Sequence, residues 1–278
     1  MAPSDLTTIT RLRHELHASP ERSGQEHETR RIIRAFLETH TTLELHEEPD
    51  ILYAVHREPG AEETVALRAD IDALPLGDGA SHLCGHDGHA AALCGVALAI
   101  EGRQLGRNVL LLFQPAEETG AGAALCCPVL EKEHVTAIYG EHNLPGFPRG
   151  QIFTRNGTFA CASLGMTLRF TGAPAHAAYP ETGRSPAPAV GELLCAVPKL
   201  SEPLPGEGLV LCTVIGVDMG EKAFGKSASQ AEVWLTLRAE RNSALQRLRH
   251  SVTELAERAA ARDGLSLSIE EQDVFPAV

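Results

Sequence analysis

The sequence of 278 residues is short of positive charge and has no long apolar run, and each shortage excludes a class of partner. It carries 24 Lys and Arg against 37 Asp and Glu, which gives a net charge of −13 at pH 7. That balance argues against nucleic acid or an anionic membrane as a main partner. No apolar stretch reaches the roughly 20 residues that a membrane-spanning helix needs. We therefore expect a globular protein that binds neither nucleic acid nor a membrane.

The sequence also lacks the marks of a secreted, disulfide-bonded protein. Residues 1–6 show no basic and then apolar leader, and the seven cysteines are odd in number. We therefore expect a reduced, cytoplasmic chain. Cys84 alone has metal-ligating neighbours. The other six cysteines stand among apolar or small residues and are expected to be small buried side chains, namely Cys94, Cys126, Cys127, Cys161, Cys195 and Cys212.

Against these absences, one short segment is dense in metal-ligating side chains. His82-Leu-Cys-Gly-His-Asp-Gly-His89 holds three histidines, Cys84 and Asp87. Imidazole and thiolate together suit zinc and similar divalent ions, and the two glycines allow tight turns around a small centre. The apolar run Ala90–Ile100 follows directly and predicts a buried helix. The alternative is a polar, histidine-rich loop whose side chains are satisfied by ordinary hydrogen bonds.

The first half of the chain alternates strands and helices. Its order indicates an α/β fold with a mostly parallel sheet flanked by helices. After amphipathic helices at Asp5–His17 and Glu26–His40, the pattern predicts, in βαβαβ order, the elements Thr64–Asp70, Gly88–Ile100, Asn108–Gln114, Ala121–Lys132 and Val135–Tyr139.

Acidic and histidine side chains follow the ends of the three predicted strands. Asp70 and Asp72 end the first strand. Glu117 and Glu118 come just after the second, and Glu141 and His142 come just after the third. Because the active crevice of such a sheet lies beyond the carboxyl ends of its strands, we expect these side chains to meet where the histidine-rich loop begins its helix.

The second half has a different rhythm, the βαββαβ order of a ferredoxin-like lid or dimerisation domain. A long helix, Asn242–Arg262, is expected to begin at an N-cap of Asn242 or Ser243 and to end at Gly264. We expect a catalytic domain at residues 1–160, the lid at 161–272 and the start of a return to the catalytic domain at 273–278. The other predicted elements are Leu164–Thr171, Pro186–Leu200, Leu209–Gly216, Ala231–Arg238 and Leu265–Glu270.

The adjacent carboxylates Glu117 and Glu118 favour metal-assisted hydrolysis. Neighbouring side chains point in different directions, so that one can bind a metal ion while the other faces substrate. The ion would acidify a water molecule and polarise a carbonyl, and the free carboxylate would carry the proton to the leaving group. The alternative is a solvated pair in the first turn of a helix, where Glu is favourable.

These segments resemble the aminoacylase and carboxypeptidase-G family of metallopeptidases, peptidase family M20. The resemblance is strongest to its amidohydrolase subfamily, which includes hippurate hydrolases, N-acyl-amino-acid deacylases and auxin-conjugate hydrolases. Six motifs stand in the right order, and the resemblance runs from about residue 11 to residue 276. The motifs are Arg13–His17 with Pro20-Glu21, Leu67–Pro75, His82–Ala90, Leu112–Glu118, Tyr139–Pro145 and Gly172–Ala177.

The resemblance implies a site for two divalent ions, zinc or manganese, with cobalt or nickel also possible. Carried over position by position, it makes Glu117 the general base. The implied metal ligands are Cys84, His86, Glu118 and His142.

The resemblance also implies roles for residues around the ligands. Asp70 and Asp72 would orient metal-bound imidazoles. His176 would reach a substrate carboxylate or the developing oxyanion, often across the interface of a homodimer formed through the lid. Arg68 is expected to form a structural ion pair, and His89 is expected either to orient a ligand or simply to pack.

Two features depart from the family pattern. Family members continue beyond the lid and supply one more ligating histidine, whereas this sequence stops at Val278. We therefore expect the C-terminal part of the catalytic domain to be missing. The family's lid asparagine also has no counterpart in Ala223–Ser229, where Lys226 or Ser227 would take its role.

The predicted activity is a metal-dependent amidohydrolase that cleaves the amide bond of N-acyl amino acids. One alternative is a truncated or non-catalytic relative that binds a metal or a small acid, or that only dimerises. Another is a dipeptidase or aminopeptidase of the same superfamily, although no residue set in the sequence marks a pocket for a free ammonium group.

Overall fold

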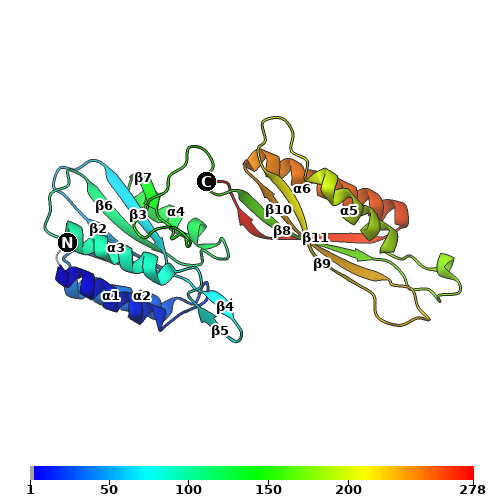
Figure 1. The fold of residues 1–278 in the computed structure, drawn as a ribbon, viewed down its shortest axis with the longest axis horizontal. Helices are drawn as coiled ribbons and strands as arrows, with labels where there is room; N and C mark the ends of the chain where they lie inside the picture. The colour runs from blue at the N-terminus through cyan, green and yellow to red at the C-terminus, as the bar shows by residue number, and fades with distance from the viewer. Residues whose placement is uncertain (1–2) are drawn as a thin grey trace. The chain divides into compact units, whose positions relative to one another are not determined.

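The computed structural model describes residues 3–278. The sequence analysis expects no leader in residues 1–6, and the first two of these residues lie outside the described part. The chain divides into two compact units, Met1–Gln151 and Ile152–Val278 (Figure 1). Within the described residues, no helix combines the length and the apolar character needed to cross a membrane.

The first unit is built on a five-stranded sheet with the strand order β1-β2-β6-β3-β7. β3 pairs in parallel with β6 and with β7, whereas β2 runs antiparallel to β1 and to β6. Along the chain its elements are α1 (Pro3–His17), α2 (His27–His40), β1 (Glu44–Glu48), β2 (Ile51–His56), β3 (Thr64–Asp70), the hairpin of β4 (Leu74–Leu76) and β5 (Gly79–Ser81), α3 (His86–Ile100), β6 (Asn108–Gln114), α4 (Gly122–Lys132) and β7 (Val135–Gly140).

The sheet is mixed, so the expectation of a mostly parallel sheet is wrong. The sequence pattern does not predict β1 and β2. β1 is an acidic edge strand without a fully buried side chain, and a tight turn at Asp50, with φ of 66°, leads from it into β2. Strands joined by such a turn must run antiparallel, and they extend the predicted parallel group of β6, β3 and β7.

Helices cover both faces of this sheet because its central strands are apolar on both sides. Leu111 and Phe113 of β6 pack in the cluster that α1, α2 and α3 complete. The alternate residues Leu110 and Leu112 face the other way, toward Val129 of α4. This double burial explains why β6 reads as an unbroken apolar run in the sequence.

The parallel strands place their carboxyl ends at one edge. The chain leaves β3, returns through α3 to β6 on one side, and then passes through α4 to β7 on the other side. β3 therefore lies between its two successors, the arrangement that opens a crevice at the strand ends.

The second unit has an antiparallel sheet of strand order β11-β8-β10-β9. Helices α5 and α6 lie side by side on one face of it (Figure 1). The core is apolar, with Leu168, Phe170 and Val233 fully buried. Its elements are β8 (Ala162–Thr171), the short 3-10 helix η1 (Pro180–Thr182), α5 (Ala187–Leu200), β9 (Val210–Met219), β10 (Gln230–Ala239), α6 (Asn242–Asp263) and β11 (Ser266–Phe275).

Two details of this unit differ from the sequence expectations, and a third agrees with them. Arg241 precedes α6 as its N-cap, and the side chain of Asn242 instead accepts a hydrogen bond from the Ala277 backbone N–H at 2.7 Å. β11 runs on to Phe275, which pairs with Ser163 of β8. The expected termination of α6 at Gly264 is confirmed by its left-handed backbone, with φ of 65°.

The expected burial of the cysteines is wrong for three of them. Cys94, Cys126 and Cys212 are buried, whereas Cys127 and Cys195 are exposed and Cys161 is half-buried. Small-residue surroundings in the sequence do not tell which face of a helix a cysteine takes.

Candidate metal centre

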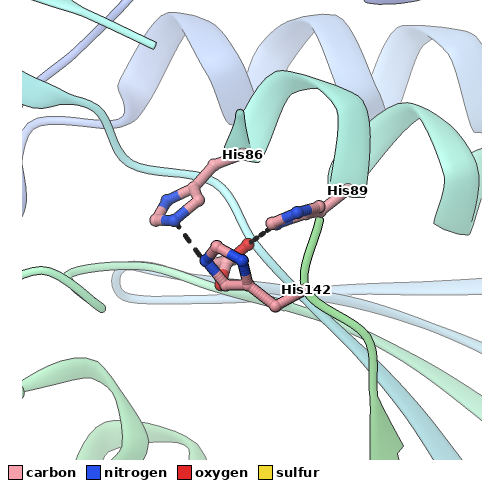
Figure 2. A group of neighbouring side chains, drawn as sticks. His86, His89 and His142 are labelled. Carbon is pink, nitrogen blue, oxygen red and sulfur yellow. Dashed lines mark hydrogen bonds and ion pairs between the residues drawn. The ribbon is translucent and has the colours of Figure 1, made fainter. Parts of the chain in front are cut away.

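The carboxyl ends of β3, β6 and β7 and the first turn of α3 bring metal-ligating side chains together in the first unit. α3 begins at His86, directly after Gly85 in left-handed conformation with φ of 86°. Figure 2 shows His86 and His89 of α3 and His142, from the segment after β7, pointing toward one another. The ring centroids of His89 and His142 are 4.6 Å apart, and those of His86 and His142 are 5.8 Å apart.

His86 is fully buried and held by one of its two ring nitrogens. Its Nδ1 donates to the carbonyl oxygen of Asp72 at 3.0 Å and lies 3.1 Å from Oδ1 of the same residue. Its Nε2 is 3.7 Å from Oε1 of Glu118. Burial opposes protonation of His86, but the hydrogen bond to Asp72 and the nearby carboxylates outweigh burial and raise its pKa.

Cys84 and His142 complete this grouping. Sγ of Cys84 lies 3.4 Å from Nε2 of His142, whose Nδ1 donates to the Asn143 carbonyl oxygen at 2.8 Å. Burial and the charge of Glu118 raise the pKa of the Cys84 thiol to about 12. A divalent cation would reverse that balance, because metal binding stabilises the thiolate.

Two polar atoms in this grouping are buried without a hydrogen-bond partner among the described residues, Nε2 of His86 and Oε1 of Glu118. Buried polar atoms are normally paired, so both atoms face a position that a cation would satisfy. Ligand atoms of Cys84, His86 and Glu118 all lie within 4.8 Å of one another. The donor set of sulfur, nitrogen and oxygen therefore fits a zinc-like divalent ion.

A second group of ligand atoms within 4.8 Å shares His86 with the first and comprises Asp70, His86, His89 and His142. Both ring nitrogens of His89 are already engaged. Its Nδ1 donates to Oδ1 of Asp70 at 2.6 Å, and its Nε2 accepts the Asn143 backbone N–H at 3.0 Å. The geometry therefore gives His89 an orienting position, one of the two alternatives that the sequence leaves open.

Asp70 and Asp72 are fully buried beside the ligand atoms. Burial opposes ionisation of Asp70, but the hydrogen bond from His89 and the charge of Arg68 outweigh it and lower its pKa to about 2. Arg68 forms the expected ion pair, with its guanidinium 2.8 Å from Oδ2 of Asp70. Asp72 likewise has a lowered pKa, because its hydrogen bond with His86 helps to outweigh burial.

Glu117 stands apart from both groups of possible ligands. It is half-buried, and burial together with the negative charge of Asp70 raises its pKa. The structure thus separates the two adjacent carboxylates, because Glu118 joins Cys84 and His86 while Glu117 does not.

Asn143 is a residue of this site that the sequence reasoning missed. Its Nδ2 donates to the carbonyl oxygen of Cys84 at 2.6 Å and contacts Nε2 of His89 at 2.8 Å. A Cβ at Gly85 would lie 2.4 Å from the same amide nitrogen, so the glycine makes room for the link. The signal in the sequence is its position directly after His142, but nothing there reveals its partners.

His176 lies in the second unit and is exposed. Its Nδ1 accepts the Ala178 backbone N–H at 3.1 Å, and its backbone pairs with that of Lys226 in an isolated antiparallel bridge. The structure therefore places Lys226, one of the two residues expected in the role of the lid asparagine, beside His176.

The family model described as "Peptidase family M20/M25/M40" matches residues 66–276. The chain belongs to this family. N-acetylcysteine deacetylase of Bacillus subtilis is 30% identical over 98% of this chain and 76% of its own length. N-acetyldiaminopimelate deacetylase of Oenococcus oeni is 29% identical over 94% of this chain and 73% of its own length.

Among solved structures, this fold matches the YXEP protein of Bacillus subtilis, described as a dinuclear metal-binding peptidase of the M20 family. The TM-score is 0.81 at 28% identity, and the match covers 100% of this chain and 76% of the other. The family resemblance is thereby confirmed. The alignments take in nearly the whole of this chain and do not support the expectation that the catalytic domain lacks its C-terminal part.

Proposed function

We propose that this protein is a metal-dependent amidohydrolase that cleaves the amide bond of small N-acyl amino acids. The observation that carries the proposal is the separation of the two carboxylates, with Glu118 among the ligand atoms and Glu117 half-buried beside them. The similarity to two deacetylases of N-acetylated amino acids supports the substrate class.

The ligands in this proposal are Cys84, His86, Glu118 and His142, with two divalent ions per site. Support comes from the two imidazoles, whose Nδ1 atoms are tied to oxygen acceptors so that Nε2 is available. The mixed set of sulfur, nitrogen and oxygen ligands admits several divalent ions, namely zinc, manganese, cobalt and nickel. A bound ion would supply a Lewis acid that polarises the amide carbonyl and lowers the pKa of water.

Glu117 is the general base of the proposed reaction. Its carboxylate takes a proton from the attacking water and passes it to the nitrogen of the departing amino acid. Its raised pKa suits this work, since a carboxyl group that ionises closer to neutral pH can both accept and release a proton. Asp72 keeps the ligating imidazole of His86 in the tautomer that leaves Nε2 unprotonated, and Asp70 orients the neighbouring ring of His89.

The second unit is a ferredoxin-like lid and dimerisation domain in this proposal. β9 is an edge strand with apolar, largely exposed side chains, among them Leu211, Ile215 and Val217. An exposed apolar edge of this kind invites pairing with a second copy of the same strand. We place His176 and Lys226 in contact with the substrate carboxylate, because their backbones are paired and each side chain carries an N–H donor. In this structure the ammonium group of Lys226 forms an ion pair with Glu221, which the substrate carboxylate would replace. The reduced chain would work in the cytoplasm.

The test is hydrolysis of N-acetylcysteine, N-acetyldiaminopimelate and N-benzoylglycine by the protein supplied with zinc or manganese. The expected result is release of free amino acid that a chelator abolishes and that added metal restores. Metal content, measured on the same samples, separates loss of the ion from loss of the fold. Bound metal without turnover on any substrate would contradict the proposal and favour the non-catalytic alternative. Turnover confined to unblocked dipeptides would favour the dipeptidase alternative.

A further inference from the structure

Glu26 is a buried carboxylate to which the proposed reaction assigns no role. It precedes α2 and is 0% exposed. Its Oε1 accepts two backbone N–H groups, from Gly24 at 2.9 Å and from Ala116 at 2.8 Å. Burial of a carboxylate destabilises a fold unless the group is hydrogen-bonded. One of the two groups that bond to Glu26 belongs to a segment 90 residues further along the chain.

The segment that Glu26 holds leads directly into the two carboxylates of the site. Ala116 immediately precedes Glu117 and has φ of 48°, a left-handed conformation that is uncommon for a residue other than glycine. Its carbonyl oxygen accepts the N–H of Gly122 at 3.0 Å, and a Cβ at Gly122 would lie 1.6 Å from the carbonyl oxygen of Pro115. The backbone N–H of Ala116 is therefore held by Glu26, and its carbonyl oxygen is held by Gly122.

The same N-terminal segment holds the other end of the carboxylate pair. Ser23 donates to Oδ2 of Asp72 at 2.7 Å, and that oxygen also accepts the backbone N–H of Glu118 at 3.0 Å. The residues from Ser23 to Glu26 thus reach the backbone before Glu117 directly and the backbone of Glu118 through Asp72.

We propose that Glu26 is a positioning residue for Glu117 and Glu118. Its carboxylate holds the left-handed turn at Ala116 and so sets the direction in which the two carboxylates leave the strand. The catalytic part of this inference rests on the proposed function. The part that concerns Glu118 as a ligand can be read from metal affinity alone.

Glu21 provides a matched control on the same segment. Its carboxylate also accepts two backbone N–H groups, but those of Glu28 at 3.1 Å and Thr29 at 2.8 Å at the start of α2. A purely structural carboxylate should behave as Glu21 does. Glu21→Ala is therefore expected to lower the melting temperature by roughly 2–4 °C and to leave zinc affinity and kcat of the folded protein unchanged.

The experiment measures zinc affinity by competition with a chromophoric chelator, together with kcat and KM. Glu26→Ala is expected to weaken zinc affinity and to lower kcat by about 10–100-fold each, with KM changed by less than about threefold. Glu26→Gln, which keeps an acceptor for both N–H groups, is expected to restore most of both. Ala116→Gly in the Glu26→Ala background is expected to recover several-fold of the affinity, because glycine adopts the turn without support.

A Glu26→Ala variant that matches Glu21→Ala in affinity and kcat would overturn the inference. If Glu26→Ala does not fold, Glu26→Asp carries the test, since it withdraws the carboxylate by one methylene. A folded Glu26→Asp variant with parental affinity and kcat would equally overturn it. Absence of turnover in the parent would count against the proposed function, while the zinc affinities would still decide the role of Glu26.

Discussion

The interiors of the two units differ in how many polar side chains they bury beside their apolar cores. The second unit has an apolar core between two helices and a four-stranded sheet. Thr167 is the one polar side chain that it buries among the described residues. In its described part, the first unit buries twelve polar side chains, and most of the ionisable ones gather at the end of β3 and around the start of α3. The twelve are Glu26, Thr29, Arg30, Thr64, Asp70, Asp72, His82, His86, Asp87, His89, Gln114 and Glu133.

The difference shows that the candidate metal centre of the first unit is built from buried polar groups that lower the stability of the fold. Buried polar groups are costly even when they are hydrogen-bonded, whereas apolar packing stabilises a fold without any further function. Seven side-chain atoms of the first unit are buried without a hydrogen-bond partner among the described residues, and Nε2 of His86 and Oε1 of Glu118 are two of them. Substitutions of the buried polar side chains at the candidate site should therefore change function more than stability, and substitutions in the apolar core of the second unit the reverse.

The largest functional effect is expected from Glu117→Gln. The amide keeps the size of the side chain but cannot accept the proton, so kcat should fall by about 10²–10⁴-fold. Because Glu117 is not among the grouped ligand atoms, metal content and melting temperature should stay close to those of the parent. Steady-state kinetics and metal analysis of the same preparation check this, and a variant with near-parental kcat would remove Glu117 as the base.

The largest stability effect is expected from Phe170→Ala in the core of the second unit. Phe170 is 1% exposed, and its loss should lower the free energy of unfolding by about 3–5 kcal/mol. Zinc affinity of the folded protein should not change. Arg169→Ala, on the opposite face of the same strand, is the control and should leave stability nearly unchanged. A loss of zinc affinity in the folded Phe170→Ala variant would contradict the claim that the core of the second unit serves stability and not metal binding.

A smaller effect is expected from acid on the metal-free protein. The pKa of Asp70 is about 2 in the fold against 3.8 in the unfolded chain, so its ionised form stabilises the fold above pH 3.8. That contribution, about 2 kcal/mol, is lost as the pH falls through the folded pKa toward 2. The second unit buries no carboxylate among its described residues, so it should stay folded to a lower pH than the first unit.

The single tryptophan makes this comparison measurable, because Trp234 lies in β10 of the second unit. Between pH 4 and pH 2, far-ultraviolet circular dichroism should change before Trp234 fluorescence does. Asp70→Asn should shift the first change to higher pH and leave the fluorescence curve in place. Coincident curves that move together in the variant would show that the two units do not differ in the way proposed.

The parts of the fold that follow from local pattern are those that sequence predicts. β3, β6 and β7 are apolar runs between turns, and α6 ends at a glycine in left-handed conformation, so each is visible in the chain. β1 is not, because Glu44–Glu48 is acidic and gains its strand pairing only from β2. The mixed character of the sheet depends on that pairing and could not be read from the sequence.

The candidate site divides in the same way. The strand-end rule gathers Glu118 and His142 near His86, and the structure brings these three together with Cys84. Which histidine is free to bind an ion depends on partners far along the chain. The engagement of both nitrogens of His89 requires Asn143, 54 residues away, and no periodicity reveals such a contact. The assignment of Cys84, His86, Glu118 and His142 as metal ligands stays a proposal.

The most direct test of the metal centre is a cobalt(II) titration followed in the near-ultraviolet. Binding through Cys84 should produce a thiolate-to-cobalt charge-transfer band that saturates with added metal. The band should be lost in Cys84→Ser and retained in Cys127→Ser, a control at an exposed cysteine. No band in the parent, or an equal band in Cys84→Ser, would contradict the proposal that this cluster is a metal site with Cys84 as a ligand.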